Sequence, residues 1–170
     1  IISLYTECFY ELVPHLMIWH DHNLNYCHYN LKLYINKLLR NIAIRFILFK
    51  LTIMVNSESL HANVLLFDKE LNELYRFEPY GNVDVLDSKL LDRTIQNNFK
   101  KYFGDFIYFS PNDFLYETNF QLNSNDSDFD NKKIGDPLGY CLAFCFWFIE
   151  TKVKNPNKNI KELMKESFDK

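Results

Sequence analysis

The chain has 170 residues, of which 48% are hydrophobic and 24% charged, with only 4 glycines and 5 prolines. This composition is typical of a compact globular domain and excludes a disordered or collagen-like chain. The formal charge of −3 provides no basic excess for nucleic acid, and the longest uncharged apolar run, Tyr140–Ile149, is far too short to cross a bilayer. We expect a single domain over residues 1–170, with no nucleic-acid or membrane partner.

The first 43 residues are expected to form a helical N-terminal part. Between Asn30 and Asn41 the apolar residues recur at helical spacing with lysines and an arginine between them, which predicts an amphipathic helix packed on the core. Residues 44–55 then become rich in Ile, Leu, Phe and Val and end at a turn-forming Asn-Ser-Glu-Ser segment. This change of pattern predicts a long strand.

Two shorter apolar runs, 60–67 and 73–77, flank a polar segment and read as the arms of a hairpin. With the strand before them they predict a three-stranded antiparallel meander. A helix should follow, starting at Asp87 or Ser88 and ending at Gly104, where a left-handed cap is expected. Residues 106–109 are a further strand candidate, and the acidic segment 123–131 is predicted to be an exposed loop.

The most apolar stretch, residues 142–153, predicts a helix buried in the middle of the domain, ended by Asn155-Pro156. A short amphipathic helix at 160–168 closes the chain. Strands followed by helices, with no βαβ alternation, predict an α+β fold in which an antiparallel sheet packs against the buried helix.

The hairpin brings a histidine near a carboxylate. If its turn is centred between Lys69 and Glu70, facing residues have numbers that sum to 139, so His61 faces Glu78. Facing side chains have Cβ atoms about 4.5–5.5 Å apart, and a carboxylate at that distance orients an imidazole and stabilises its charged form. A half-exposed ion pair that closes the sheet edge is the alternative reading, and Asn82 is an alternative partner for His61.

A cysteine begins the buried helix. Cys141 falls in the first helical turn, where the positive end of the helix dipole and the exposed N–H groups favour a thiolate. Cys145 lies one turn further along and should be an inert core thiol. Neither geometry nor spacing favours a bridge between these two, and we expect Cys8, Cys27 and both helical cysteines to be reduced thiols in a reducing compartment. The alternative reading of Cys141 is a small buried apolar residue.

Together, His61, Glu78 and Cys141 supply the base, the orienting group and the nucleophile of a thiol acyl-transfer site. The order His, then an acid across a hairpin, then Cys at the start of a buried helix resembles the adenovirus-protease and Ulp1-like (SUMO-protease) class of cysteine peptidases, known as clan CE. Papain-like enzymes have the reverse order. The stretches His61–Asn63, Arg76–Gly81 and Gly139–Cys141 also look like those of a set of uncharacterised proteins of large DNA viruses of protists.

The resemblance covers a peptidase-like core over residues 44–157, followed by a C-terminal helix at 158–170. It implies an oxyanion hole completed by a glutamine before the cysteine, and Gln121 is the candidate. Two features depart from the family: Gln121 lies twenty residues ahead of Cys141, and Ala62 stands where an aromatic residue usually follows the histidine.

The function that the resemblance implies is hydrolysis of an amide bond after Gly-Gly, in a viral precursor or in a ubiquitin-like conjugate, in the host cytoplasm or the virion. A protein substrate is then the expected partner, and no cofactor or metal is expected. The alternative is a catalytically inactive viral protein that keeps the peptidase fold and serves as a structural or partner-binding component.

Overall fold

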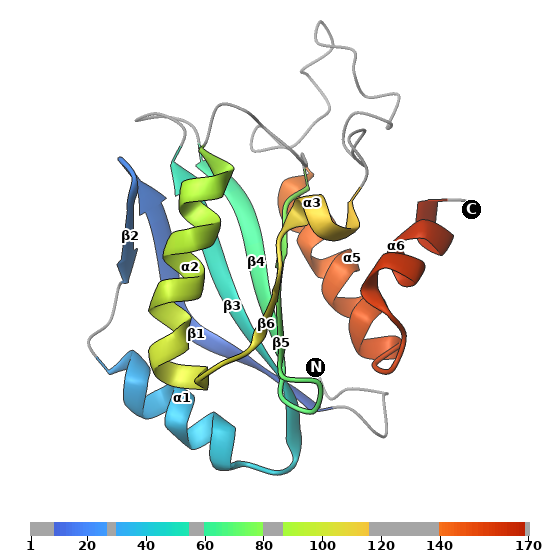
Figure 1. The fold of residues 1–170 in the computed structure, drawn as a ribbon, viewed down its shortest axis with the longest axis horizontal. Helices are drawn as coiled ribbons and strands as arrows, with labels where there is room; N and C mark the ends of the chain where they lie inside the picture. Colours follow the sequence, from blue (N-terminus) through green and yellow to red (C-terminus); the bar gives the residue numbers. More distant parts are fainter. Residues whose placement is uncertain (1–8, 27–29, 55–59, 80–86, 116–139, 169–170) are drawn as a thin grey trace, which may run out of the picture.

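A computed structural model describes residues 9–26, 30–54, 60–79, 87–115 and 140–168. Figure 1 shows a mixed α+β arrangement in which helices cover both faces of one curved sheet. The elements, in chain order, are β1 (Phe9–His20), β2 (Asn23–Tyr26), α1 (Leu31–Arg40), β3 (Ile44–Met54), β4 (Leu60–Asp68), β5 (Glu73–Phe77), α2 (Ser88–Phe103), β6 (Ile107–Phe109), α3 (Pro111–Phe114), α5 (Cys141–Lys154) and α6 (Ile160–Phe168).

The sheet has the strand order β2-β1-β3-β4-β5-β6. The predicted meander β3-β4-β5 is antiparallel throughout, and β2 also pairs antiparallel with β1. Two pairings depart from the antiparallel expectation, because β1 runs parallel to β3 and β6 runs parallel to β5. The α+β class is therefore correct, and the sheet is mixed but mostly antiparallel.

Each face of the sheet supports its own apolar core. Alternate residues of β4 point to opposite faces, as the period of a strand requires. Leu65 and Phe67 pack with residues of α1 and α2, whereas Val64 and Leu66 pack with residues of α5 and α6. Figure 1 shows α2 on one side of the sheet and α5 and α6 on the other. The site residues lie where these two layers meet at one end of the sheet.

The expectation of a helical N-terminal part is wrong for most of its described length. Only α1 is helical there, and β1 and β2 are strands. The sequence of β1 hides its strand period because apolar residues occupy outward positions such as Leu12, which is exposed, as well as buried positions such as Val13 and Met17. Pro14 within the segment also argues against an interior strand, since proline lacks the N–H that a ladder needs.

The hairpin register differs from the predicted one by two residues. The observed pairs are Val64 with Phe77 and Leu65 with Arg76, so the numbers of facing residues sum to 141. The turn is longer than expected because the Asp68 carboxylate accepts hydrogen bonds from the backbone N–H groups of Glu70 and Leu71. A shift of two residues leaves every side chain on its predicted face. Continued by one pair, this register sets Glu78 opposite Asn63 and diagonal to His61.

Helix α5 is less deeply buried than the sequence predicts. Cys145, Phe148 and Ile149 are buried against the sheet, but Leu142 is 54% exposed and Phe146 59% exposed. The helix therefore has one buried and one exposed face, although apolar residues occur on both. The predicted stop is confirmed, because the helix ends at Lys154 and the backbone N–H of Asn155 bonds the carbonyl of Lys152.

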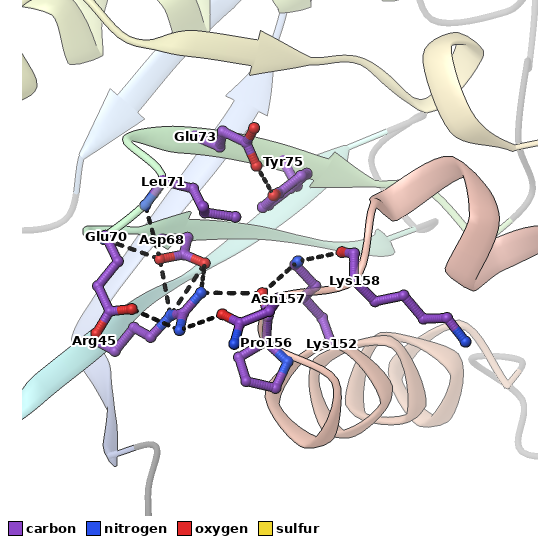
Figure 2. A network of polar contacts seen from close by, with 10 residues as sticks. All are labelled: Arg45, Asp68, Glu70, Leu71, Glu73, Tyr75, Lys152, Pro156, Asn157 and Lys158. Carbon is purple, nitrogen blue, oxygen red and sulfur yellow. Dashed lines mark hydrogen bonds and ion pairs between the residues drawn. The ribbon is translucent and has the colours of Figure 1, made fainter.

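The far end of α5 is fastened to the sheet by two buried cations, shown in Figure 2. The Arg45 guanidinium bonds both carboxylate oxygens of Asp68 and reaches the Pro156 carbonyl at 3.0 Å, while the Lys152 ammonium donates to the carbonyls of Pro156 and Lys158. Lys152 also lies over the ring of Tyr75. The Arg45 contacts join the segment between α5 and α6 to β3 and β4, at the opposite end of α5 from Cys141.

Candidate active site

His61 and Glu78 form a buried pair at the end of the sheet where β4 begins. His61 is the second residue of β4 and Glu78 follows the last residue of β5. The two side chains are only 5% and 2% exposed, and His61 Nε2 hydrogen-bonds Glu78 Oε1. A buried carboxylate in this position fixes the imidazole tautomer and stabilises its protonated form. Because Nε2 is engaged by Glu78, Nδ1 is the ring nitrogen available to a further partner.

Cys141 supplies that partner from the other layer. It is the first residue of α5, which starts beside the beginning of β4 (Figure 1), and its side chain is 3% exposed. Burial by itself raises the pKa of this thiol. The hydrogen bond to His61 and backbone hydrogen bonds at Ala62 and Leu142 outweigh burial, and the pKa of Cys141 lies below its ordinary value. The thiolate, which is the nucleophilic form, is thereby favoured.

The pKa of His61 moves in the opposite direction. Burial lowers it, but hydrogen bonds to Cys141 and Glu78 and the negative charges of both raise it to about 9. A raised imidazole pKa beside a lowered thiol pKa favours a proton on the ring and a negative charge on the sulfur. The three residues can thus present a nucleophile together with an acid for a leaving group.

Cys145 lies one turn along the same helix and has a different environment. Its Sγ donates to the Ala62 carbonyl at 3.6 Å, and its side chain is buried among apolar residues. Burial, followed by the nearby charges of Glu78 and Cys141, raises the pKa of Cys145 well above the ordinary value. Neither helical cysteine takes part in a disulfide. The pKa values of the two helical cysteines therefore move in opposite directions.

The structure brings together three of the four predicted site residues. Gln121 lies outside the described residues, as do the acidic segment 123–131 and the approach to α5 at 136–139. Asn82, the alternative partner of His61, is outside them too. The partner that the structure gives for His61 Nε2 is Glu78.

Two polar residues to which the sequence reasoning gave no role lie next to this site. Asn63 Nδ2 donates to Glu78 Oε2 at 2.9 Å, and Arg76 Nη1 donates to Asn63 Oδ1 at 3.1 Å. Both lie on the same sheet face as His61 and Glu78, because Asn63 is two residues after His61 and Arg76 is two residues before Glu78. The alternation of strand residues could have identified them. Polar residues at 61, 63, 76 and 78 all fall on one face of the hairpin, which is otherwise apolar and buried.

Two further observations bear on other kinds of site. In the described parts of the chain, no three His, Cys, Asp or Glu side chains converge as metal ligands would. No helix in those parts combines the length and apolar character needed to span a membrane.

Comparison with known proteins gives a match to a viral protein. No protein-family model matches the chain. The chain is 29% identical over 137 residues to a protein of Acanthamoeba polyphaga mimivirus that is named as an ankyrin repeat protein. The match covers 72% of this chain and 18% of the mimivirus protein, so the chain spans less than a fifth of that relative's length.

Proposed function

We propose that this chain is a cysteine peptidase or isopeptidase of the adenovirus-protease and Ulp1-like type. The observation that carries the proposal is the contiguous buried set Cys141, His61 and Glu78, in which a thiol at a helix start bonds an imidazole that is held by a carboxylate. The same order of residue types along the chain characterises that peptidase class. The fold supplies each group from a different element, α5, β4 and the end of β5.

In the proposed reaction the Cys141 thiolate attacks the carbonyl carbon of an amide and forms a C–S bond, while the carbonyl electrons move to oxygen. The His61 imidazolium then gives its proton to the leaving nitrogen as the C–N bond breaks, which leaves an acyl-enzyme. Neutral His61 next takes a proton from water as the water oxygen attacks the thioester, and the C–S bond then breaks, which releases the acid product and restores the thiolate and the imidazolium. Glu78 keeps the ring oriented through both steps.

The charge that develops on the carbonyl oxygen needs hydrogen-bond donors. The first N–H groups of α5 have no carbonyl partner within the helix, whose first backbone bond runs from Phe144 N to Tyr140 O. The Cys141 N–H is the donor that the proposal assigns, with Gln121 as its companion. Donors that are already fixed in place lower the barrier of acyl transfer without reorganisation.

The proposed substrates are proteins, either a viral precursor or a conjugate of a ubiquitin-like modifier, cleaved after Gly-Gly in the host cytoplasm or the virion. The alternative is a catalytically inactive peptidase-fold protein that binds a partner, and the residue that favours it is Ala62, which directly follows His61 where the peptidases usually carry an aromatic ring.

The test uses ubiquitin and SUMO probes whose C-terminal Gly-Gly carries an electrophile, together with a Gly-Gly peptide bearing a fluorogenic amide. We expect wild type and Cys145→Ala to form a covalent adduct and to release the fluorophore, and Cys141→Ala to do neither. Cys145→Ala is the matched control because it removes a thiol from the same helix. If the protein forms no adduct with the probes and releases no fluorophore, although Cys141 is readily alkylated, the inactive alternative is favoured. Adducts on Cys145 would contradict the assignment of the nucleophile.

A further inference from the structure

Beyond the three groups already described, a continuous chain of buried polar side chains extends from Glu78 across the sheet face to α2. Asn63 links Glu78 to Arg76, and Arg76 bonds Asp92 of α2 through two nitrogens, Nε at 2.7 Å from Oδ1 and Nη2 at 3.2 Å from Oδ2. The Tyr108 hydroxyl of β6 also donates to Asp92 Oδ1, at 2.6 Å. Four secondary-structure elements therefore support one carboxylate.

The two oxygens of Glu78 have separate partners. Oε1 bonds the imidazole of His61, and Oε2 accepts from the Asn63 amide. A carboxylate held at one oxygen alone can rotate about its terminal torsion, whereas one held at both cannot. The bond from Asn63 therefore fixes the plane in which Glu78 meets the imidazole.

Arg76 determines which way the Asn63 amide points. A guanidinium has donors only, so the atom of Asn63 that faces Arg76 Nη1 must be the carbonyl oxygen. The amide nitrogen is then left to face Glu78, where a donor is needed. Arg76 itself is 2% exposed and its charge is balanced by Asp92, with Glu78 Oε2 at 4.0 Å from its Nη1. This order of donors and acceptors leaves one consistent orientation for each group.

We propose that Asn63 and Arg76 are positioning residues that hold the Glu78 carboxylate, and through it His61, in the orientation that faces Cys141. This inference deepens the proposed function and rests on it. Neither residue touches the reacting atoms; Arg76 orients the Asn63 amide, and Asn63 orients Glu78. Polar side chains that only stabilise a core can take either orientation. The Glu78 carboxylate must take one orientation if it is to hold His61 toward Cys141.

The test measures the imidazole of His61 directly by NMR titration in the free protein, with its signal assigned by its loss in His61→Gln. Asn63→Leu removes both amide bonds without placing a new charge in the core. We expect the His61 midpoint, near 9 in wild type, to fall by about one unit because a rotated carboxylate stabilises the imidazolium less. Val64→Ala is the matched control on the same strand, because its side chain lies on the opposite face, and it should leave the midpoint unchanged.

A second measurement shows whether Asn63 acts through Glu78. In a Glu78→Gln background, Asn63→Leu should cause no further fall, since the group that it positions is already changed. Arg76→Lys keeps a positive charge but cannot bond Asn63 and both Asp92 oxygens together, and it should lower the midpoint by a smaller amount. Circular dichroism and thermal unfolding identify any variant that loses its fold.

The outcomes separate this inference from the proposed function. An unchanged midpoint in folded Asn63→Leu and folded Arg76→Lys would overturn the positioning role, whatever the activity. A full additional fall in the Glu78→Gln background would overturn it as well. If instead the midpoints shift as expected while wild type cleaves no amide, the positioning role stands and the peptidase assignment fails.

Discussion

Cys141 and Cys145 lie four positions apart on one helix, and their pKa values move in opposite directions because their neighbours differ. Cys141 contacts an imidazole and backbone donors at the helix start, and its pKa is lowered. Cys145 is enclosed by apolar side chains, and burial raises its pKa. Both side chains are buried to the same fraction, 3% exposed. Hydrogen bonds and charge therefore lower the pKa of Cys141 despite its burial, whereas burial has the largest effect on the pKa of Cys145.

The first prediction concerns the pH dependence of Cys141 alkylation. Its lowered pKa means that the thiolate persists below the range of an ordinary thiol, about 8.5. We expect iodoacetamide to modify Cys141 at pH 7 on the order of ten times faster in wild type than in His61→Gln, which lacks the stabilising imidazolium. Peptide mass spectrometry separates Cys141 from Cys145. Equal rates in the two proteins would contradict the ion pair.

The second prediction concerns the alkaline limit of activity. The pKa of His61 is raised to about 9, so the imidazolium is present below that pH and is lost above it. Amide hydrolysis should decline as the pH rises through 9, because neutral His61 cannot protonate the leaving nitrogen. Alkylation of Cys141 does not need that proton and should not decline. A parallel fall in both would point to unfolding.

At the scale of elements, α2 illustrates how well local signals specify helix ends. Asp87 was a predicted cap, and its carboxylate accepts from the Leu90 N–H at 3.1 Å. Gly104 was the predicted stop, and it has a φ of +72° in the region that favours glycine. Asp87 itself has a φ of +40°, which asparagine and aspartate tolerate better than other residues. Helix α2 carries Asp92, so its ends influence the support of the site.

The third prediction tests the α2 cap. Asp87→Ala removes the side-chain acceptor and also sets alanine at a positive φ, and it should lower the free energy of unfolding by about 1–2 kcal/mol. Asp87→Asn keeps an acceptor and tolerates the same backbone conformation, so it should stay within about 0.5 kcal/mol of wild type. Urea unfolding followed by circular dichroism measures both. Equal losses in the two variants would show that the acceptor is not the important feature.

For the whole molecule, the decisive contacts are those that join layers far apart in sequence. Figure 2 shows Arg45 of β3 bound to Asp68 of β4 and to the segment between α5 and α6 at Pro156 and Asn157. Asp68 is fully buried, and this guanidinium forms an ion pair with it. The network lies at the opposite end of α5 from Cys141. It joins the segment after the helix to the sheet.

The fourth prediction tests this network. Arg45→Met leaves the Asp68 carboxylate buried without its cation, and the free energy of unfolding should fall by about 3–5 kcal/mol. The double variant Arg45→Met with Asp68→Leu removes the stranded charge as well and should recover part of that loss. Lys50→Met is the control, because Lys50 is exposed on the same strand and should change stability by less than about 0.5 kcal/mol. Chemical unfolding measures all three, and a double variant no more stable than the single one would contradict the argument.

The sequence by itself determined the elements whose signals are local. Helical spacing, caps and apolar runs located α1, α2, α6 and the strands β3, β4 and β5 to within about two residues. Each of these signals depends only on residues that are close together in the sequence. It also supplied the residue types of the candidate site, since a histidine, an acid and a cysteine each stood at an element's end. The sequence did not identify β1 as a strand, because apolar residues lie on both of its faces.

Only the tertiary structure decided the contacts that depend on register and on packing between layers. The hairpin turn, lengthened by Asp68, set Glu78 opposite Asn63, so the bond between these two side chains could not be read from spacing alone. The approach of Cys141 to His61 depends on how α5 packs on the sheet, through Cys145, Phe148 and Ile149 and through the bond from Arg45 to the segment after the helix. Such contacts join residues up to 112 positions apart, and no local pattern encodes them.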